Sequence, residues 1–295
     1  MKHLKYEIFF LSIACLVVSA SARIDLYKEI KITNEKSLRV KINGSFETIF
    51  LNKGPADKVC TISRKTDSHS SPGVYVDYSI SNGVGYLEID LDRDGDHSEK
   101  FNHATPIAKA GFSHEEEGDW YITFPEVLPI DFDLEFDVGK ADLNLSGLQI
   151  TRLNLATGAS KVYLKSYSPN QQMAEKVSIE AGIGKFSGEQ LGNLNFKELT
   201  FEGGIGSYKL DLSGALRSDA QVKTEVGMGS LTIILPKNTS AKLYCEDHWL
   251  NTCNFQHFFN RGDGIYETKN LESSAKHVTI RAECGVGSIN VKWSE

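Results

Sequence analysis

Three aspartates, Asp90, Asp92 and Asp94, occupy alternate positions just before Gly95 in the segment DLDRDGD. Carboxylate oxygens at alternate positions are typical of the first half of a calcium-binding loop. An EF-hand loop ends in glutamate at its twelfth position, and Phe101 stands there instead. The same acids alternate with apolar residues, so they equally fit the wet face of a strand that ends in an Asp-Gly turn. The strand is the favoured interpretation, and calcium is the alternative.

Two cysteines and two histidines lie close together further along the chain, at Cys245, His248, Cys253 and His257. Thiolate and imidazole groups at such spacings are able to hold zinc. An exported protein more often oxidises two neighbouring cysteines, and a bond between Cys245 and Cys253 would close a short loop. We therefore predict a disulfide or buried free thiols here, with no metal and no cofactor.

The same segment carries four large aromatic residues, Trp249, Phe255, Phe258 and Phe259. They could cover the end of a stacked β-structure, whose last strand would otherwise expose backbone hydrogen-bonding groups. They could also form a contact patch for a protein or a glycan. We favour a capping loop at 245–266 and keep the contact patch as the alternative.

A glycine phrase recurs through the second half of the chain as EAGIG, EGGIG, EVGMG and ECGVG. One glycine-rich turn that opens a helix is able to bind a nucleotide phosphate. Here apolar and polar residues alternate after every copy, which is typical of strands. Across each phrase the alternation slips by one residue, and glycine permits the bulge or corner that such a slip requires. The phrases therefore predict backbone corners rather than a phosphate site.

The predicted corners recur at a period of about 22 residues, which is typical of stacked rungs that cannot bury their apolar faces alone. The corner positions are Gly139, Ser160, Gly184, Gly206, Gly229 and Gly287, with an earlier copy at Gly85. The residues just before the later corners, which we expect to point inward, are Val138, Ala159, Ile183, Ile205, Met228 and Val286. The predicted fold is all-β, a parallel β-solenoid or β-helix-like repeat with rungs of roughly 22 residues and Gly-x-Gly corners.

The start of the chain has a basic end, an apolar core and the small residues Ala20-Ser21-Ala22, which is typical of a secretory signal peptide. We expect residues 1–22 to be removed and the mature chain to be exported to the periplasm or cell surface. A lipid on Cys15 is the alternative. No later apolar run approaches the roughly 20 residues of a membrane span. The expected layout is an N-terminal β region at 23–130 and a repeat region at 131–295 within one domain.

The formal net charge of −7 makes nucleic acid an unfavourable partner, because an acidic surface repels the phosphate backbone. No local sequence signature of a nucleophile is present either. Composition and motifs therefore indicate neither nucleic-acid binding nor a particular class of enzyme.

A longer pattern resembles the toast-rack family of bacterial envelope proteins. It runs from Asp119-Trp120 through FDVGKADLNLSGLQITRLNLATGASKVYL to VGMGSLTIILPKNTSAKL, and is followed by GDGIYET and ECGVGSINVKW. The likeness is clearest over 120–295 and looser over 30–119. Relatives include outward domains of regulators that respond to cell-wall-active antibiotics, and adhesin-like proteins. The resemblance implies a non-enzymatic β-repeat module without established catalytic residues.

The expected function is therefore that of a non-enzymatic, exported cell-envelope or adhesin-like protein, with an envelope protein or a surface glycan as its partner. The alternative is a carbohydrate-binding or polysaccharide-cleaving β-solenoid. A glycosidase of that kind needs carboxylates that face one another. The acids of this chain are scattered along its strands and turns.

Overall fold

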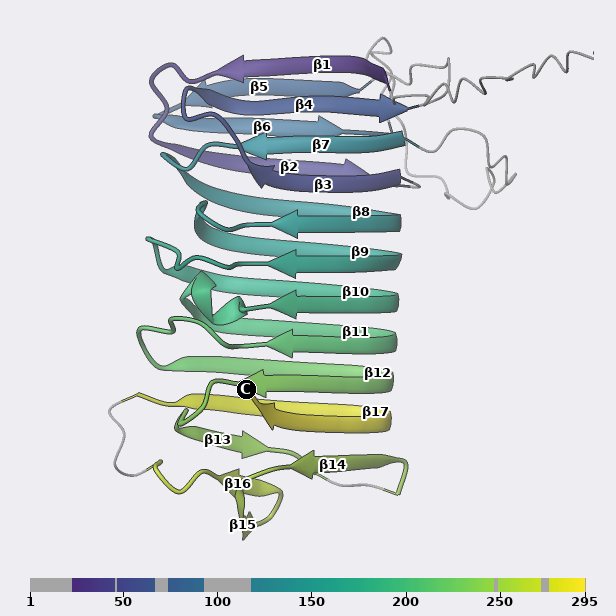
Figure 1. Cartoon of the computed structure of the whole chain (residues 1–295), viewed down its shortest axis with the longest axis vertical. Coiled ribbons are helices and arrows are strands. Elements are labelled where there is room, and N and C mark those ends of the chain that lie inside the picture. The colour runs from purple at the N-terminus through teal and green to yellow at the C-terminus, as the bar shows by residue number, and fades with distance from the viewer. Residues whose placement is uncertain are drawn as a thin grey trace, which may run out of the picture.

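The structure is a computed structural model that describes residues 23–45, 47–66, 74–92, 118–246, 249–271 and 276–294 (Figure 1). The predicted signal peptide lies outside the described residues. Apart from a short 3-10 helix, η2 (Leu191–Leu194), the regular elements in this part of the chain are strands, which confirms the prediction of an all-β protein. None of the described helical segments is long and apolar enough to cross a membrane.

Long strands that stack in parallel form the body of the molecule. Within the described residues they are β8 (Pro129–Asn144), β9 (Gln149–Lys165), β10 (Ala174–Glu189), β11 (Phe196–Asp211), β12 (Ala220–Leu235) and β17 (Val278–Trp293). Each pairs with the next in parallel. Figure 1 shows each of them crossing the stack, turning at one edge and running back. The first halves therefore build one wall and the second halves build another, and we call these the first wall and the second wall.

The core lies between the two walls. Phe201 of the first wall packs against Phe186 and Tyr208 of the second, with ring centroids 5.4 and 5.2 Å apart. All three side chains are buried, and the Tyr208 hydroxyl donates a hydrogen bond to the carbonyl oxygen of Gly182 at 3.1 Å. Alternate apolar side chains thus hold the walls together by removing their surface from water.

The edge where the strands turn brings neighbouring backbones very close together. Gly184 pairs with Gly206, which pairs with Gly229, which in turn pairs with Gly287. Gly229 has a φ of +133°, a region that side chains rarely adopt, whereas Gly206 does not lie there. A Cβ atom on Gly206 would instead collide with the carbonyl oxygen of Gly184. The reason for glycine at Gly206 is therefore close packing and not a positive φ.

The residues just before this edge do not point inward, contrary to our expectation. Ile183, Ile205 and Met228 are 59%, 52% and 48% exposed. Val138, Ala159 and Val286 are exposed as well. The strand has already begun to turn at these positions, so the side chains lie on the outer side of the bend.

The opposite edge is held by buried asparagines in the connections between strands. The Asn170 side-chain amide donates to the carbonyl oxygens of Ile150, at 2.7 Å, and Leu194, at 3.0 Å. Asn193 donates to the carbonyl oxygen of Ser166 at 2.8 Å. These bonds connect successive turns of the chain and satisfy backbone groups that would otherwise be buried without partners.

The N-terminal part extends both walls with shorter strands. They are β1 (Arg23–Lys31), β2 (Ser37–Gly44), β3 (Glu47–Lys53), β4 (Lys58–Thr66), β5 (Tyr75–Ser81), β6 (Val84–Asp90) and β7 (Gly118–Phe124). β2 and β3 pair in parallel with the first and second halves of β8. The first wall continues through β6 to β5, and the second through β7 and β4 to β1. The pairs β5–β6, β4–β7 and β1–β4 are antiparallel, so this end departs from a regular parallel solenoid.

Gly85 is not equivalent to the later glycines, and that prediction is wrong. It lies inside β6, where a Cβ atom would come within 2.6 Å of the Tyr78 hydroxyl. The turn between β5 and β6 is made by Asn82 and Gly83, with φ values of 52° and 78°. An Asn-Gly pair of this conformation is typical of a two-residue hairpin. The glycine in this copy therefore makes room for an aromatic ring beside a hairpin.

At the C-terminal end, the order of the strands in the sheet differs from their order in the sequence. β13 (Ala241–Tyr244) pairs with the first half of β17, and β14 (Asn251–Phe255) pairs with its second half. β17 therefore lies between β12 and these two strands, as Figure 1 shows. The segment expected to be an irregular loop at 245–266 instead contains β14, β15 (Phe259–Gly262) and most of β16 (Ile265–Glu267).

We predict that a side chain at the turning edge destabilises the protein more than its unfavourable φ alone would, because the neighbouring backbone lies so close. Gly229→Ala would place a Cβ atom against the carbonyl oxygen of Gly206 at a φ of +133°. It should lower the free energy of unfolding by about 3 kcal/mol or more, measured by urea denaturation. The control is Gly262→Ala, which has a φ of +92° and open space around the added atom. It should cost only about 1 kcal/mol, and equal losses in the two variants would contradict this account.

Candidate functional site

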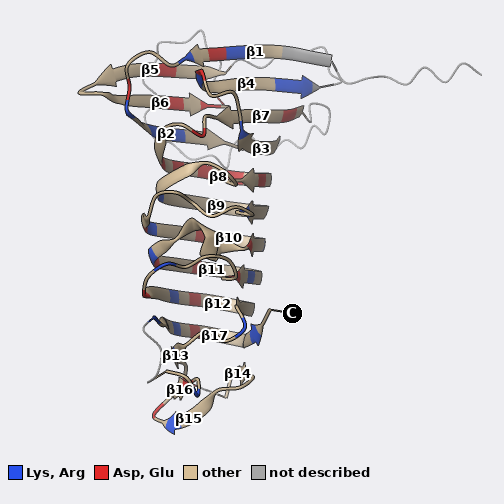
Figure 2. Ribbon diagram, turned by 60° about the vertical axis from the view of Figure 1, so that its left-hand side comes forward, with Lys and Arg blue, Asp and Glu red and all other residues tan. Residues whose placement is uncertain are grey.

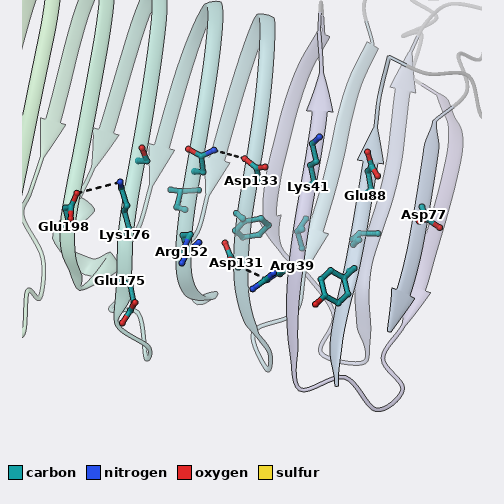
Figure 3. A pocket seen from close by; sticks show the side chains of 17 residues that line it. Arg39, Lys41, Asp77, Glu88, Asp131, Asp133, Arg152, Glu175, Lys176 and Glu198 are labelled. Carbon is teal, nitrogen blue, oxygen red and sulfur yellow. Dashed lines mark hydrogen bonds and ion pairs between the residues drawn. The ribbon is translucent and has the colours of Figure 1, made fainter. Parts of the chain in front are cut away.

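A groove crosses the outer face of the first wall, over β6, β2, β8, β9, β10 and β11 (Figure 3). Its volume is about 940 Å³. In Figure 2 the β5–β6 hairpin projects beyond the strands stacked below it, so one end of the groove is bounded by this hairpin. Strand spacing of about 4.8 Å makes the groove about 24 Å long across the strands.

The centre of the groove is lined by opposite charges on neighbouring strands. Arg39 and Lys41 occupy alternate outward positions of β2, and their register partners on β8 are Asp131 and Asp133. Arg152 on β9 is the register partner of Asp131 on its other side. An acidic strand thus lies between two strands that carry basic side chains, and Figure 3 shows these residues side by side.

The acidic side chains make one hydrogen bond and one longer ion pair. The Asn154 amide donates to Asp133 Oδ1 at 2.7 Å, and Arg39 Nε lies 3.9 Å from Asp131 Oδ2. Arg39 also lies over the exposed ring of Tyr86, at 5.9 Å from its centroid. An exposed aromatic face beside fixed hydrogen-bonding groups is suited to a sugar ring or to an apolar side chain.

The far end of the groove has a second exposed charge pair. Lys176 Nζ lies 3.8 Å from Glu198 Oε1, and both side chains are 52% exposed. Exposed pairs at this distance contribute about 0–1 kcal/mol, because water screens them. Lys176 and Glu198 can therefore give up their contact with each other and pair with the charges of a ligand, at little cost in free energy.

The chemistry available in the groove is that of charge and hydrogen bonding. The described residues contain no group of three histidine, cysteine or acidic side chains placed to hold a metal ion. The groove is suited to an extended ligand that carries both charges or many hydroxyl groups. The sequence indicated this surface only weakly, in the alternation of RVKI and DFDL, because it does not reveal that these two strands are neighbours.

The three calcium candidates are not brought together as a described site. Asp90 Oδ1 accepts a hydrogen bond from the backbone N–H of Asp92 at 3.1 Å. Asp92 Oδ1 accepts one from the backbone N–H of Ser45 at 2.8 Å. Asp94 lies outside the described residues. The oxygens that are described stabilise the end of β6, and calcium binding stays a prediction.

Cys245 and Cys253 lie close enough for their sulfur atoms to be joined as a disulfide. His248 lies outside the described residues, and the exposed His257 ring lies 6.5 Å from that of Trp293. Two joined sulfur atoms supply no thiolate, so this arrangement favours the staple over the zinc alternative.

The four aromatic candidates fall into two pairs. Phe255 and Phe258 are partly buried against the core, with Phe255 4.8 Å from the ring of Tyr266 and Phe258 5.9 Å from that of Trp293. Trp249 and Phe259 are exposed, by 92% and 51%. Packing therefore occupies the first pair, and only the second pair is available to a partner.

We predict that the disulfide forms in the exported protein. In chain lacking residues 1–22, alkylation after unfolding should label only Cys60 and Cys284, and prior reduction should expose Cys245 and Cys253 as well. Both of the first two thiols are buried, and burial raises the pKa of Cys60 to about 12, so neither should react in the native state. Reduction should add about 2 Da to the intact mass, because two hydrogens are gained. Stoichiometric zinc in the native protein, with four thiols after unfolding, would contradict the staple.

No curated protein matches the chain significantly. Among solved structures, a "putative cell adhesion protein" from Clostridium sporogenes is 18% identical, with 93% of this chain and 100% of that one covered and a TM-score of 0.44. A "putative adhesin" from Bacteroides fragilis is 14% identical, with 92% and 98% covered and a TM-score of 0.39. Neither likeness is close enough to carry a functional argument.

A family model described as the N-terminal domain of toast_rack, DUF2154, matches residues 19–187. This range includes the N-terminal part that we expected to resemble the family only loosely, and it ends at residue 187, whereas the clearest resemblance was expected over 120–295. It spans more than half of the sequence and includes the strands that form most of the groove. The chain therefore belongs to the toast-rack family.

Proposed function

We propose that the chain is an exported, non-enzymatic, adhesin-like protein of the cell envelope, and that the groove on its first wall is its binding surface. The supporting observation is the row of opposed charges on β2, β8 and β9. An acidic strand between two basic ones is complementary to an extended ligand with the same alternation. Such complementarity contributes mainly to specificity and to the rate of association. The ligand class is a segment of an envelope protein or a surface glycan.

The scaffold supports binding because it positions the groove without any rearrangement. In our interpretation its unit is a rung of roughly 22 residues with a glycine corner, and outward side chains at equivalent positions form straight rows. Binding to such a preformed surface avoids the entropic cost of ordering a loop. The layout that we propose keeps residues 23–130 and 131–295 in one domain, after a cleaved signal at 1–22.

The segment at 245–266 has a separate proposed role as a cap. It would protect the edge of β17 from pairing with other chains, since exposed strand edges invite association. The exposed Trp249 and Phe259 are the part of the earlier contact patch that is available as a secondary contact. Deletion of this segment should therefore cause association of the purified protein.

A polysaccharide-binding or polysaccharide-cleaving solenoid is the second candidate, and one observation favours it. Asp131 and Asp133 both line the groove, and Asp133 is held by Asn154. Retaining and inverting glycosidases both use a pair of carboxylates across the scissile bond. Polysaccharide turnover that Asp133→Asn abolishes would replace the binding proposal with an enzymatic one.

We predict that binding depends on the basic side chains of the groove. The labelled mature chain would be applied to a glycan array and to an array of extended peptides that carry both charges. Arg39→Ala combined with Arg152→Ala should weaken binding to any retained probe by about tenfold, because two exposed charge contacts are lost. The control is Arg217→Ala, an exposed arginine outside the groove, which should leave binding unchanged. The proposal would be contradicted if Arg217→Ala weakened binding as much as the double variant does, or if the labelled chain bound no probe on either array.

A further inference from the structure

A continuous apolar ridge runs along the edge where the long strands turn. Its members are register partners on successive strands, from β8 to β12 and then β17: Val138, Ala159, Ile183, Ile205, Met228 and Val286. All of them are exposed, Ile183 by 59%. Five strand spacings give the ridge a length of about 24 Å. A continuous exposed apolar row on a water-soluble scaffold marks an interaction surface.

Each side of the ridge carries its own row of polar side chains. Three residues before the ridge residue, on the first wall, all rungs but one have glutamate: Glu135, Glu180, Glu202, Glu225 and Glu283. Two residues after it, on the second wall, every rung has lysine or serine: Lys140, Lys161, Lys185, Ser207, Ser230 and Ser288. Because the strand turns between the two positions, the acidic row and the lysine–serine row flank the ridge on opposite sides.

We propose that this ridge is a homodimer interface, in which a second copy of the chain docks ridge to ridge with a twofold axis parallel to the stack. Such a rotation keeps each rung level with its own copy and exchanges the two walls. Glu180 then faces Lys185 of the partner subunit, and Glu202 faces Ser207 of the partner subunit. The surface is self-complementary, as a twofold interface requires.

Other arrangements of the same ridge are less favourable. An antiparallel pair would place one acidic row against the other, and like charges at an interface are repulsive. A lipid bilayer would meet the whole glutamate row beside the apolar side chains, and anionic headgroups would repel it. The parallel twofold pair is the arrangement that opposes each acidic position to a basic or hydroxyl group.

The dimer should be weak, because the ridge is narrow. Interfaces that bury less than about 1,200 Å² usually belong to transient complexes. We expect a dissociation constant on the order of 10–100 µM. The pairs of glutamate and lysine lie on β8 and β10. Salt screens exposed charges, so a higher salt concentration should weaken association through this half of the ridge.

Cysteine cross-linking tests the orientation. Val138 and Val286 lie at opposite ends of the ridge, and both are 38% exposed. In the parallel dimer Val138→Cys should cross-link to its own copy, Val286→Cys should do the same, and a mixture should give no 138-to-286 product. The control is Val127→Cys, which is 49% exposed and lies outside the ridge, and it should give no dimer. A 138-to-286 cross-link would overturn the parallel arrangement.

Charge reversal tests the pairing, with sedimentation velocity of the mature chain as the measurement. Glu180→Lys and Lys185→Glu should each raise the dissociation constant about tenfold, because each creates two repulsive contacts across the twofold axis. The two variants mixed together should associate at least as well as the original chain, since every contact is then attractive. Thermal melting of dilute monomers should stay unchanged.

Three further outcomes would overturn the proposal. They are a chain that stays monomeric up to about 500 µM, well above the expected dissociation constant, a mixture that associates no better than its components, and binding of the ridge to anionic vesicles in place of self-association. The groove is a separate surface, so this test needs no ligand. Failure of the groove experiment would leave the dimer result intact, and the reverse also holds.

Discussion

The close approach of neighbouring backbones at the turning edge is the constraint on which the rest of the structure depends. The carbonyl oxygen of Gly206 occupies the space that a Cβ atom of Gly229 would need, and the same relation holds between Gly184 and Gly206. In β10, β11, β12 and β17 only a residue without a side chain fits at this edge, whereas β9 has Ser160 there. The position is therefore fixed in these four strands, and it sets their register in the stack. A slip of one residue would turn every core side chain outward.

Fixed register explains why like residues gather in rows. Inside the walls it aligns buried apolar side chains, such as Phe201 with Phe186 and Tyr208. At the opposite edge it places Asn170 within reach of carbonyl groups from both neighbouring turns. On the outside it aligns charges, so that each flank of the ridge is built from one position repeated across strands, and the groove from two such positions. A surface of this kind changes its chemistry by substitution at a single rung, without any change in the core.

Local pattern was enough to predict that the regular elements of the body are strands. Apolar residues at alternate positions of β10, such as Val177 and Ile179, are buried, because side chains of a strand alternate strictly between its faces. The same rule failed at Ile183, because alternation does not apply where the strand turns. It failed at Gly85, which lies just after a hairpin turn at Asn82 and Gly83. The insertion of β17 and the neighbours of β2 depend on contacts far apart in the sequence, so neither the strand order nor the groove could be predicted from local pattern.

The arrangement of the two surfaces bears on how such a protein would act. The groove lies on the first wall, and the ridge lies at the edge where the first wall meets the second. A twofold axis parallel to the stack turns the first walls of the two copies in opposite directions, so the grooves of a dimer would face away from each other. Two weak sites on opposite faces cannot both engage one flat surface. The two grooves are instead able to bind two separate ligands. The apparent affinity of the dimer would then increase only if both ligands were tethered. Self-association through the ridge would therefore favour a bridging role over tighter attachment to one surface.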